Sequence, residues 1–243
     1  MVHNDTYPAI DPLKVDLHGV AVFITGGSRG LGRAMALSFA KAGASHIAVG
    51  ARSSLTTLAS DIQTTAESAS HSAPQFLPIQ MDVTSPSSVA AAAAEVEKAF
   101  GKLQILINNA GILGHYGLIA DSEPREWMQV LDVNLQGPYL VTRAFLPLLL
   151  KSSGVRYIIN VTSVAAHLAE PTLSAYQISK NGLLKLSTLT DAEYASQGVV
   201  TFAIHPGNSP TDIMGGPDAI PPHLKHGSSQ THPTHPNVFF LTD

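Results

Sequence analysis

The sequence predicts an α/β fold built on a doubly wound parallel sheet in a single domain, and three observations support this. Short apolar, β-branched stretches recur along the chain, helical patterns separate them, and a glycine-rich turn follows the first stretch. Continuous apolar strands that alternate with helices are typical of a parallel sheet covered on both faces. Right-handed crossovers then give a doubly wound fold. With 243 residues, 44% of them hydrophobic, the chain can bury a sizeable core.

The elements follow from apolar runs and their spacing. The expected strands are 20–25, 46–51, 74–83, 103–110, 155–163 and 199–206. Helical patterns fill the gaps, and the main ones are the segment with Leu31, Met35 and Phe39 on one face, the alanine-rich 87–100, the stretch 124–150 and the stretch 174–196. No internal repeat or linker interrupts the pattern. We expect an N-terminal extension over 1–18, the main domain over 19–212 and a short, irregular, proline-rich segment over 213–243.

Composition excludes several classes of function. The net charge of −4 without basic runs argues against a nucleic-acid partner. The chain has no cysteines, which excludes disulfides and thiol catalysis. The first residues lack a signal-peptide core, and the apolar run 140–150 is too short to span a membrane, so we expect a cytoplasmic protein. Prolines separate four late histidines, so we expect a polar loop and no metal there: His223, His226, His232 and His235.

The turn after the first strand, "TGGSRGLG", is a candidate nucleotide site. Glycines allow a tight turn and close approach of the backbone to a pyrophosphate, and the helix that follows offers N–H groups to the anion. The spacing is G-x-x-x-G-x-G, which differs from the general dinucleotide fingerprint. An ordinary glycine-rich strand-to-helix turn is the alternative. The candidate cofactor residues are Thr25, Gly26, Ser28, Arg29, Gly30, Leu31 and Gly32.

The end of the second strand favours NADP over NAD. An NAD site usually has an acidic residue there for the ribose 2′-hydroxyl. Here the strand ends "AVGARSS", without an acid, and Arg52 and Ser53 follow directly. Together with Arg29, Arg52 suits a 2′-phosphate, which a carboxylate would repel. The alternative is that both arginines are solvated surface charges.

Two further strand ends add candidate cofactor contacts. The third ends in "MDVT", where Asp82 could accept a hydrogen bond from an adenine amino group and Val83 follows. The fourth ends in "NNAG", and its candidates are Asn109, Ala110 and Gly111. Ligands of open parallel sheets bind at the carboxyl ends of the strands. Taken alone, each of these could be a turn residue.

Ser163, Tyr176 and Lys180 are the candidate catalytic group. Ser163 ends the fifth strand, and Tyr176 and Lys180 are four residues apart, on one face of a predicted helix. A phenol with a pKa near 10 is a poor acid/base at neutral pH, but a nearby ammonium lowers that pKa. The alternative for Tyr176 and Lys180, taken alone, is that they are two neighbouring helical side chains with no catalytic role.

With these pieces in order, the chain resembles a classical short-chain dehydrogenase/reductase. The matching motifs are "TGGSRGLG", "MDVT", "NNAG", "VNLQG", "NVTS", "YQISK" and "HPGNSPT", over residues 19–212. The resemblance implies a single Rossmann domain with Tyr176 as general acid/base and Ser163 positioning the substrate. It implies that Lys180 binds the nicotinamide ribose and lowers the pKa of Tyr176. It also implies that Asn134 of "VNLQG" holds a water in a proton relay behind Lys180.

The resemblance reaches the sixth strand and then weakens. It implies that the nicotinamide and the phosphates contact Pro206, Gly207, Ser209 and Thr211, although Ser209 replaces an apolar residue and Pro210 removes an N–H. Family members continue with a helix and a last strand. Here "NVFFLTD" resembles the end of that helix, so we expect the C-terminal last strand to be missing.

The predicted function is an NADP(H)-dependent oxidoreductase that moves a hydride between the nicotinamide and a carbonyl or secondary alcohol substrate, as in a carbonyl reductase. The alternative is a cofactor-binding but inactive sensor or complex subunit, suggested by the short C-terminal segment. The resemblance implies a homodimer or homotetramer through the helices near 124–150 and 174–196. The substrate pocket is expected to come from loops after the strands, which include 111–122, 164–173 and the C-terminal segment. Their mixture of Leu, Ile, His and Tyr suggests an apolar or aromatic ketone as the substrate.

Overall fold

A single six-stranded parallel sheet organises the chain in a computed structural model that describes residues 11–207. The strand order is β3-β2-β1-β4-β5-β6. The strands are β1 (Ala21–Thr25), β2 (His46–Ala51), β3 (Gln75–Gln80), β4 (Ile105–Asn108), β5 (Tyr157–Val161) and β6 (Val200–Ile204). The chain builds outward from β1 to β3, crosses back, and builds outward again from β4 to β6. The predicted doubly wound Rossmann sheet is therefore confirmed, and its direction reverses between β1 and β4.

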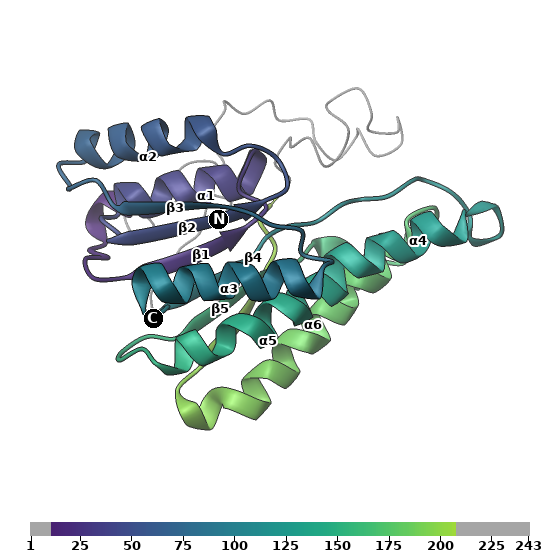
Figure 1. The fold of residues 1–243 in the computed structure, drawn as a ribbon. Coiled ribbons are helices and arrows are strands. Elements are labelled where there is room, and N and C mark those ends of the chain that lie inside the picture. Colours follow the sequence, from purple (N-terminus) through teal and green to yellow (C-terminus); the bar gives the residue numbers. More distant parts are fainter. Residues whose placement is uncertain (1–10, 208–243) are drawn as a thin grey trace.

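Helices cover both faces of the sheet (Figure 1). On one side lie α1 (Gly30–Lys41) and α2 (Thr56–Ser68), and on the other lie α3 (Pro86–Phe100), α5 (Gly137–Leu150) and α6 (Ser174–Tyr194). The short helix α4 (Pro124–Leu131) precedes α5. Alternate residues of β1 enter opposite cores, since Val22 and Ile24 pack with α1 and α2, whereas Ala21 and Phe23 pack with α3 and α5. Burial on both faces explains why the strands are continuously apolar.

The predicted elements exist, but several of their boundaries differ. The predicted strands 74–83, 103–110 and 155–163 are shorter in the structure, because pairing with the neighbouring strands covers only Gln75–Gln80, Ile105–Asn108 and Tyr157–Val161. The stretch 124–150 is also not one regular α-helix. A π-helical turn, Asp132–Gln136, separates α4 from α5 and contains the buried Asn134. Such turns are rare and occur often at functional sites.

Two prolines sit inside regular elements without breaking them. Pro147 lies within α5. Pro78 lies in β3, which among the described residues is an edge strand paired only with β2. An edge strand tolerates proline because the missing N–H does not interrupt a second ladder. At the opposite edge of the described sheet lies β6, and the predicted absence of a last strand concerns residues outside the described range.

A buried polar network fixes α5 and α6 against the sheet. Asn108 on β4 and Asn160 on β5 are register partners, and the Asn108 amide donates to Asn160 Oδ1 at 2.8 Å. The same amide donates to Thr142 Oγ1 on α5 at 3.1 Å. The Asn160 amide donates to Ser187 Oγ on α6 at 2.8 Å. Because these groups are buried, losing a partner removes a hydrogen bond that water does not replace.

Replacing Asn160 by alanine should destabilise the protein by about 2–3 kcal/mol, because both side-chain hydrogen bonds of a buried amide are lost. Urea unfolding followed by circular dichroism measures the change. The matched control is Asn181→Ala, which removes an exposed amide that donates to the Ala166 carbonyl at 3.0 Å. Equal losses in the two variants would contradict a structural role for the buried network.

Candidate functional site

The carboxyl ends of β1 and β4 are joined at the point where the sheet reverses direction. Thr25 Oγ1 accepts hydrogen bonds from the backbone N–H groups of Asn109 at 3.0 Å and Ala110 at 3.1 Å. The Asn109 side-chain amide donates back to the carbonyls of Thr25 at 2.9 Å and Gly26 at 3.1 Å. Four of the predicted cofactor residues, Thr25, Gly26, Asn109 and Ala110, therefore shape the crevice where open α/β sheets bind ligands.

The glycine turn packs tightly on the end of β4. Gly26 has φ of +71°, and a Cβ there would lie 2.8 Å from the Ala110 Cα. A Cβ at Gly32 would lie 2.4 Å from the Gly26 carbonyl oxygen. Only glycine fits these two positions without a shift of backbone. The turn also includes Ser28 and leads directly into α1, which begins at Gly30 and continues with Leu31. The first N–H groups of the helix thus come to the edge of the crevice.

The ends of β2 and β3 carry the predicted residues of the adenosine side. Arg52 and Ser53 are exposed just after β2, and Arg29 is exposed where α1 begins. Asp82 Oδ1 accepts hydrogen bonds from the N–H of Thr84 at 2.9 Å and from its hydroxyl at 2.8 Å. The N–H of Thr84 is the main cause that lowers the pKa of Asp82, and Arg52 adds a smaller effect. Val83 follows and packs on Gly137 of α5.

Ser163 and Tyr176 meet where β5 faces α6. Ser163 caps a short 3-10 helix, Val164–His167, directly after β5, and its Oγ accepts a hydrogen bond from the Ala165 N–H at 3.2 Å. A side-chain hydrogen bond also joins Ser163 to Tyr176. The sequence separates these two residues by thirteen positions, and the fold brings their hydroxyl groups together.

Lys180 is buried one helical turn after Tyr176. The residue is only 3% exposed, and its Nζ donates a hydrogen bond to the Val161 carbonyl at 2.8 Å. Nζ lies 5.7 Å from the centre of the Tyr176 ring. Burial lowers the pKa of Lys180 to about 8, because the charged ammonium loses solvation.

The expectation of a lowered Tyr176 pKa is wrong for this structure. Burial is the largest effect and raises the pKa of Tyr176, and the hydrogen bond with Ser163 opposes it. A smaller effect from Tyr116 raises the pKa further. Burial removes the phenolate from water, and Lys180, whose Nζ bonds to the Val161 carbonyl, does not offset that loss.

Asn134 joins the β4 loop to α6 from the π-helical turn. Its Oδ1 accepts from the Ile112 N–H at 2.8 Å, and its amide donates to the Ile112 carbonyl at 2.8 Å and to Ser179 Oγ at 3.1 Å. A Cβ at Gly111 would lie 3.2 Å from Asn134 Oδ1 and 3.6 Å from Lys180 Nζ. The structure thus brings Asn134 beside Gly111 and Lys180. Its predicted role in a proton relay stays a prediction.

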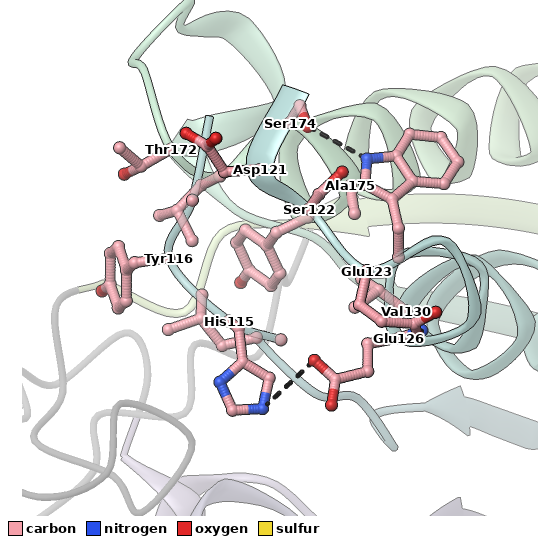
Figure 2. A pocket seen from close by; sticks show the side chains of 16 residues that line it. His115, Tyr116, Asp121, Ser122, Glu123, Glu126, Val130, Thr172, Ser174 and Ala175 are labelled. Carbon is pink, nitrogen blue, oxygen red and sulfur yellow. Dashed lines mark hydrogen bonds and ion pairs between the residues drawn. The ribbon is translucent and has the colours of Figure 1, made fainter. Parts of the chain in front are cut away.

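A pocket of about 140 Å³ opens beside Tyr176 (Figure 2). Its walls come from the loop after β4, from α4 and from the start of α6. Trp127 Nε1 donates to Ser174 Oγ at 3.0 Å, and His115 Nε2 lies 3.5 Å from Glu126 Oε2. These contacts tie the three walls together. The candidate acid/base therefore faces a space that can hold a small molecule.

Sequence reasoning assigned the pocket to loops and missed its α4 wall. Trp127 and Val130 line the pocket, and Trp127 is the only tryptophan of the chain. Tryptophan has a large apolar side chain, so its presence in this short helix could have indicated that the helix forms a wall of the pocket. No sequence signal indicates Thr172, which lines the pocket with φ of +78°, an unusual conformation for a β-branched residue.

Some predictions fall at or beyond the end of the described residues. Pro206 and Gly207 follow β6, and Gly207 has φ of +79°. Ser209, Thr211 and the four late histidines lie outside residues 11–207. Within that range, no cluster of three or more potential metal-binding side chains occurs. Across the same residues, no helix has the length and apolarity required to cross a membrane.

Comparison with known proteins identifies the family. The short chain dehydrogenase family model matches residues 20–218. The chain belongs to the short-chain dehydrogenase family. It is 70% identical to the short chain dehydrogenase tazN of Aspergillus terreus, over 93% of this chain and 49% of that protein. It is 64% identical to the short chain dehydrogenase pigC of Monascus ruber, over 92% of this chain and 74% of that protein. The chain spans about half the length of tazN.

A solved structure agrees with the fold. The crystal structure of an alcohol dehydrogenase from the archaeon Thermococcus sibiricus, complexed with 5-hydroxy-NADP, matches with a TM-score of 0.73 and 26% identity. The match covers 81% of this chain and 80% of that chain. The match therefore extends over most of both chains.

The buried ammonium of Lys180 should make stability depend on pH. Between about pH 8 and the ordinary pKa of 10.5, the unfolded chain binds this proton more strongly than the folded chain. The contribution of Lys180 to stability should therefore rise with pH across that window. We expect the wild-type protein to gain unfolding free energy relative to Lys180→Met between about pH 7.5 and about pH 9.5.

Urea unfolding at both pH values measures this difference. Lys185→Met is the matched control, because Lys185 is an exposed lysine on the same helix. Parallel pH profiles for the wild-type protein and Lys180→Met would show that burial does not shift this pKa.

Proposed function

We propose that this protein is an NADP(H)-dependent oxidoreductase that interconverts a carbonyl group and a secondary alcohol, with Tyr176 as general acid/base. The observation that carries the proposal is the meeting of Ser163, Tyr176 and Lys180 beside a pocket. A carbonyl that accepts a hydride needs a proton on its oxygen. A phenol within reach of that oxygen supplies it.

The side chains divide the work in the direction of carbonyl reduction. A nicotinamide, when bound, would supply the hydride. Ser163 holds the carbonyl oxygen by a hydrogen bond, and Tyr176 donates its phenolic proton to that oxygen. The raised pKa of Tyr176 keeps the proton in place at neutral pH. The ammonium of Lys180, close to the ring, stabilises the phenolate that forms, and Asn134 fixes the loop beside Lys180.

The residues at the crevice fit a dinucleotide with a 2′-phosphate. The glycine turn and the start of α1 suit the pyrophosphate, and Gly111 allows close approach near Lys180. Arg29 and Arg52 are exposed at the adenosine end, and β2 ends in Val49, Gly50 and Ala51, without an acid. Two guanidinium groups favour a phosphate at this place. The solved relative with 5-hydroxy-NADP supports the same choice.

The remaining predictions belong to the same proposal. The relatives are named as dehydrogenases, which favours an enzyme over an inactive cofactor-binding subunit. The proposed cofactor-binding domain is 19–212, between the N-terminal extension 1–18 and the segment 213–243. We also propose a small-molecule carbonyl or alcohol substrate, a homodimer or homotetramer and a cytoplasmic location.

Replacing Tyr176 by phenylalanine should lower the rate of NADPH-dependent carbonyl reduction by about 10²–10⁴-fold, because only the proton donor is removed. NADPH absorbance over a panel of ketones measures the rate, and NADPH binding should persist. Tyr157→Phe is the control, since Tyr157 lies on β5 against Phe202 and does not line the pocket. Full activity of Tyr176→Phe would overturn the proposed mechanism.

Replacing Arg52 by aspartate should weaken NADPH binding at least about tenfold relative to NADH, because a carboxylate repels the 2′-phosphate and accepts a ribose hydroxyl. Titration calorimetry with both cofactors measures the ratio. Arg143→Asp makes the same charge change on an exposed residue of α5 and should leave the ratio unchanged. An unchanged ratio for Arg52→Asp would remove Arg52 from the proposed phosphate site.

A further inference from the structure

Tyr116 lies in a loop that is held firmly against the substrate pocket. A Cβ at Gly114 would lie 2.6 Å from Val130 Cγ2, so the loop packs closely on α4 just before Tyr116. Just after it, the Gly117 N–H donates to the Thr172 carbonyl at 3.0 Å. Thr172 precedes α6 and has φ of +78°. The loop is thus tied to two walls of the pocket, one on each side of Tyr116.

The hydroxyl of Tyr116 is buried and has no hydrogen-bond partner among the described residues. Other polar groups of the pocket already have partners: Trp127 donates to Ser174, and Ser122 Oγ donates to the Ile119 carbonyl at 2.8 Å. A buried hydroxyl without a partner is costly, and such exceptions require an explanation. Because Tyr116 lines the pocket, a bound molecule is a partner that the pocket can provide.

Tyr116 also lies close to the candidate acid/base. Its charge, when ionised, raises the pKa of Tyr176, so the two phenols interact within one site. Burial raises the pKa of Tyr116 itself, which keeps the hydroxyl protonated at neutral pH. It can therefore both donate and accept a hydrogen bond. Figure 2 shows Tyr116 across the pocket from Glu126 and Val130.

We propose that the Tyr116 hydroxyl binds a second oxygen of the substrate, so that the site selects carbonyl compounds with a hydroxyl or carbonyl group near the reacting one. This inference rests on the proposed function. A substrate without that oxygen leaves the Tyr116 hydroxyl unpaired, and sites built to bind a substrate hydroxyl discriminate strongly against analogues that lack it.

The test compares hexan-2-one with 3-hydroxy-, 4-hydroxy- and 5-hydroxyhexan-2-one, which differ only in the presence and spacing of a second oxygen. We measure kcat/KM for NADPH-dependent reduction by the wild-type protein and by Tyr116→Phe. The variant should lose about tenfold more on the best hydroxyketone than on hexan-2-one, a change in discrimination equivalent to 1.4 kcal/mol. The control Tyr139→Phe removes the hydroxyl of an exposed residue on α5 and should change neither rate.

Fluorescence of Trp127 provides a second readout that does not depend on turnover. This sole tryptophan lines the pocket, so its fluorescence reports ligand binding there. Titration should show tighter binding of one hydroxyketone than of hexan-2-one, and Tyr116→Phe should remove the difference. Equal effects of Tyr116→Phe on all four ketones in both readouts would overturn the inference while leaving the proposed function intact. Selective binding without turnover by the wild-type protein would contradict the proposed function and retain the Tyr116 contact.

Discussion

The pairing of β4 with β5 is the constraint on which the rest of the site depends. It sets Asn108 against Asn160, and their amides reach Thr142 on α5 and Ser187 on α6. Because these hydrogen bonds are buried, they determine where α6 lies on the sheet. The same helix carries Tyr176 and Lys180, so a network without contact to any ligand determines where those two side chains lie.

The helix is also held at its catalytic end. Lys180 Nζ donates to the Val161 carbonyl, and Thr162 Oγ1 donates to the Lys180 carbonyl at 3.2 Å. These bonds join α6 to the carboxyl end of β5, directly before Ser163. From the other side, Asn134 links the loop after β4 to Ser179 on α6. The site is therefore built from strand ends and helix faces that support one another.

Burial shifts the pKa values of both Lys180 and Tyr176. The same desolvation lowers the pKa of Lys180 to about 8 and raises the pKa of Tyr176. Each shift disfavours the charged form. The result is a phenol that retains its proton at neutral pH, as a proton donor for carbonyl reduction must. Its neighbour Tyr116 contributes to this shift while its own hydroxyl stays unpaired among the described residues.

The sequence by itself determined the strand–helix alternation, the glycine turn and the Tyr176–Lys180 pair, because apolar periodicity, backbone freedom at glycine and helical spacing are local properties. Only the tertiary structure decided what depends on contacts between distant segments. It divided the stretch 124–150 with a π-helical turn and placed Asn134 beside Lys180. It also raised the pKa of Tyr176 where the pair alone predicted a lower one, because burial is set by the packed neighbours and not by the spacing of the two side chains along the helix.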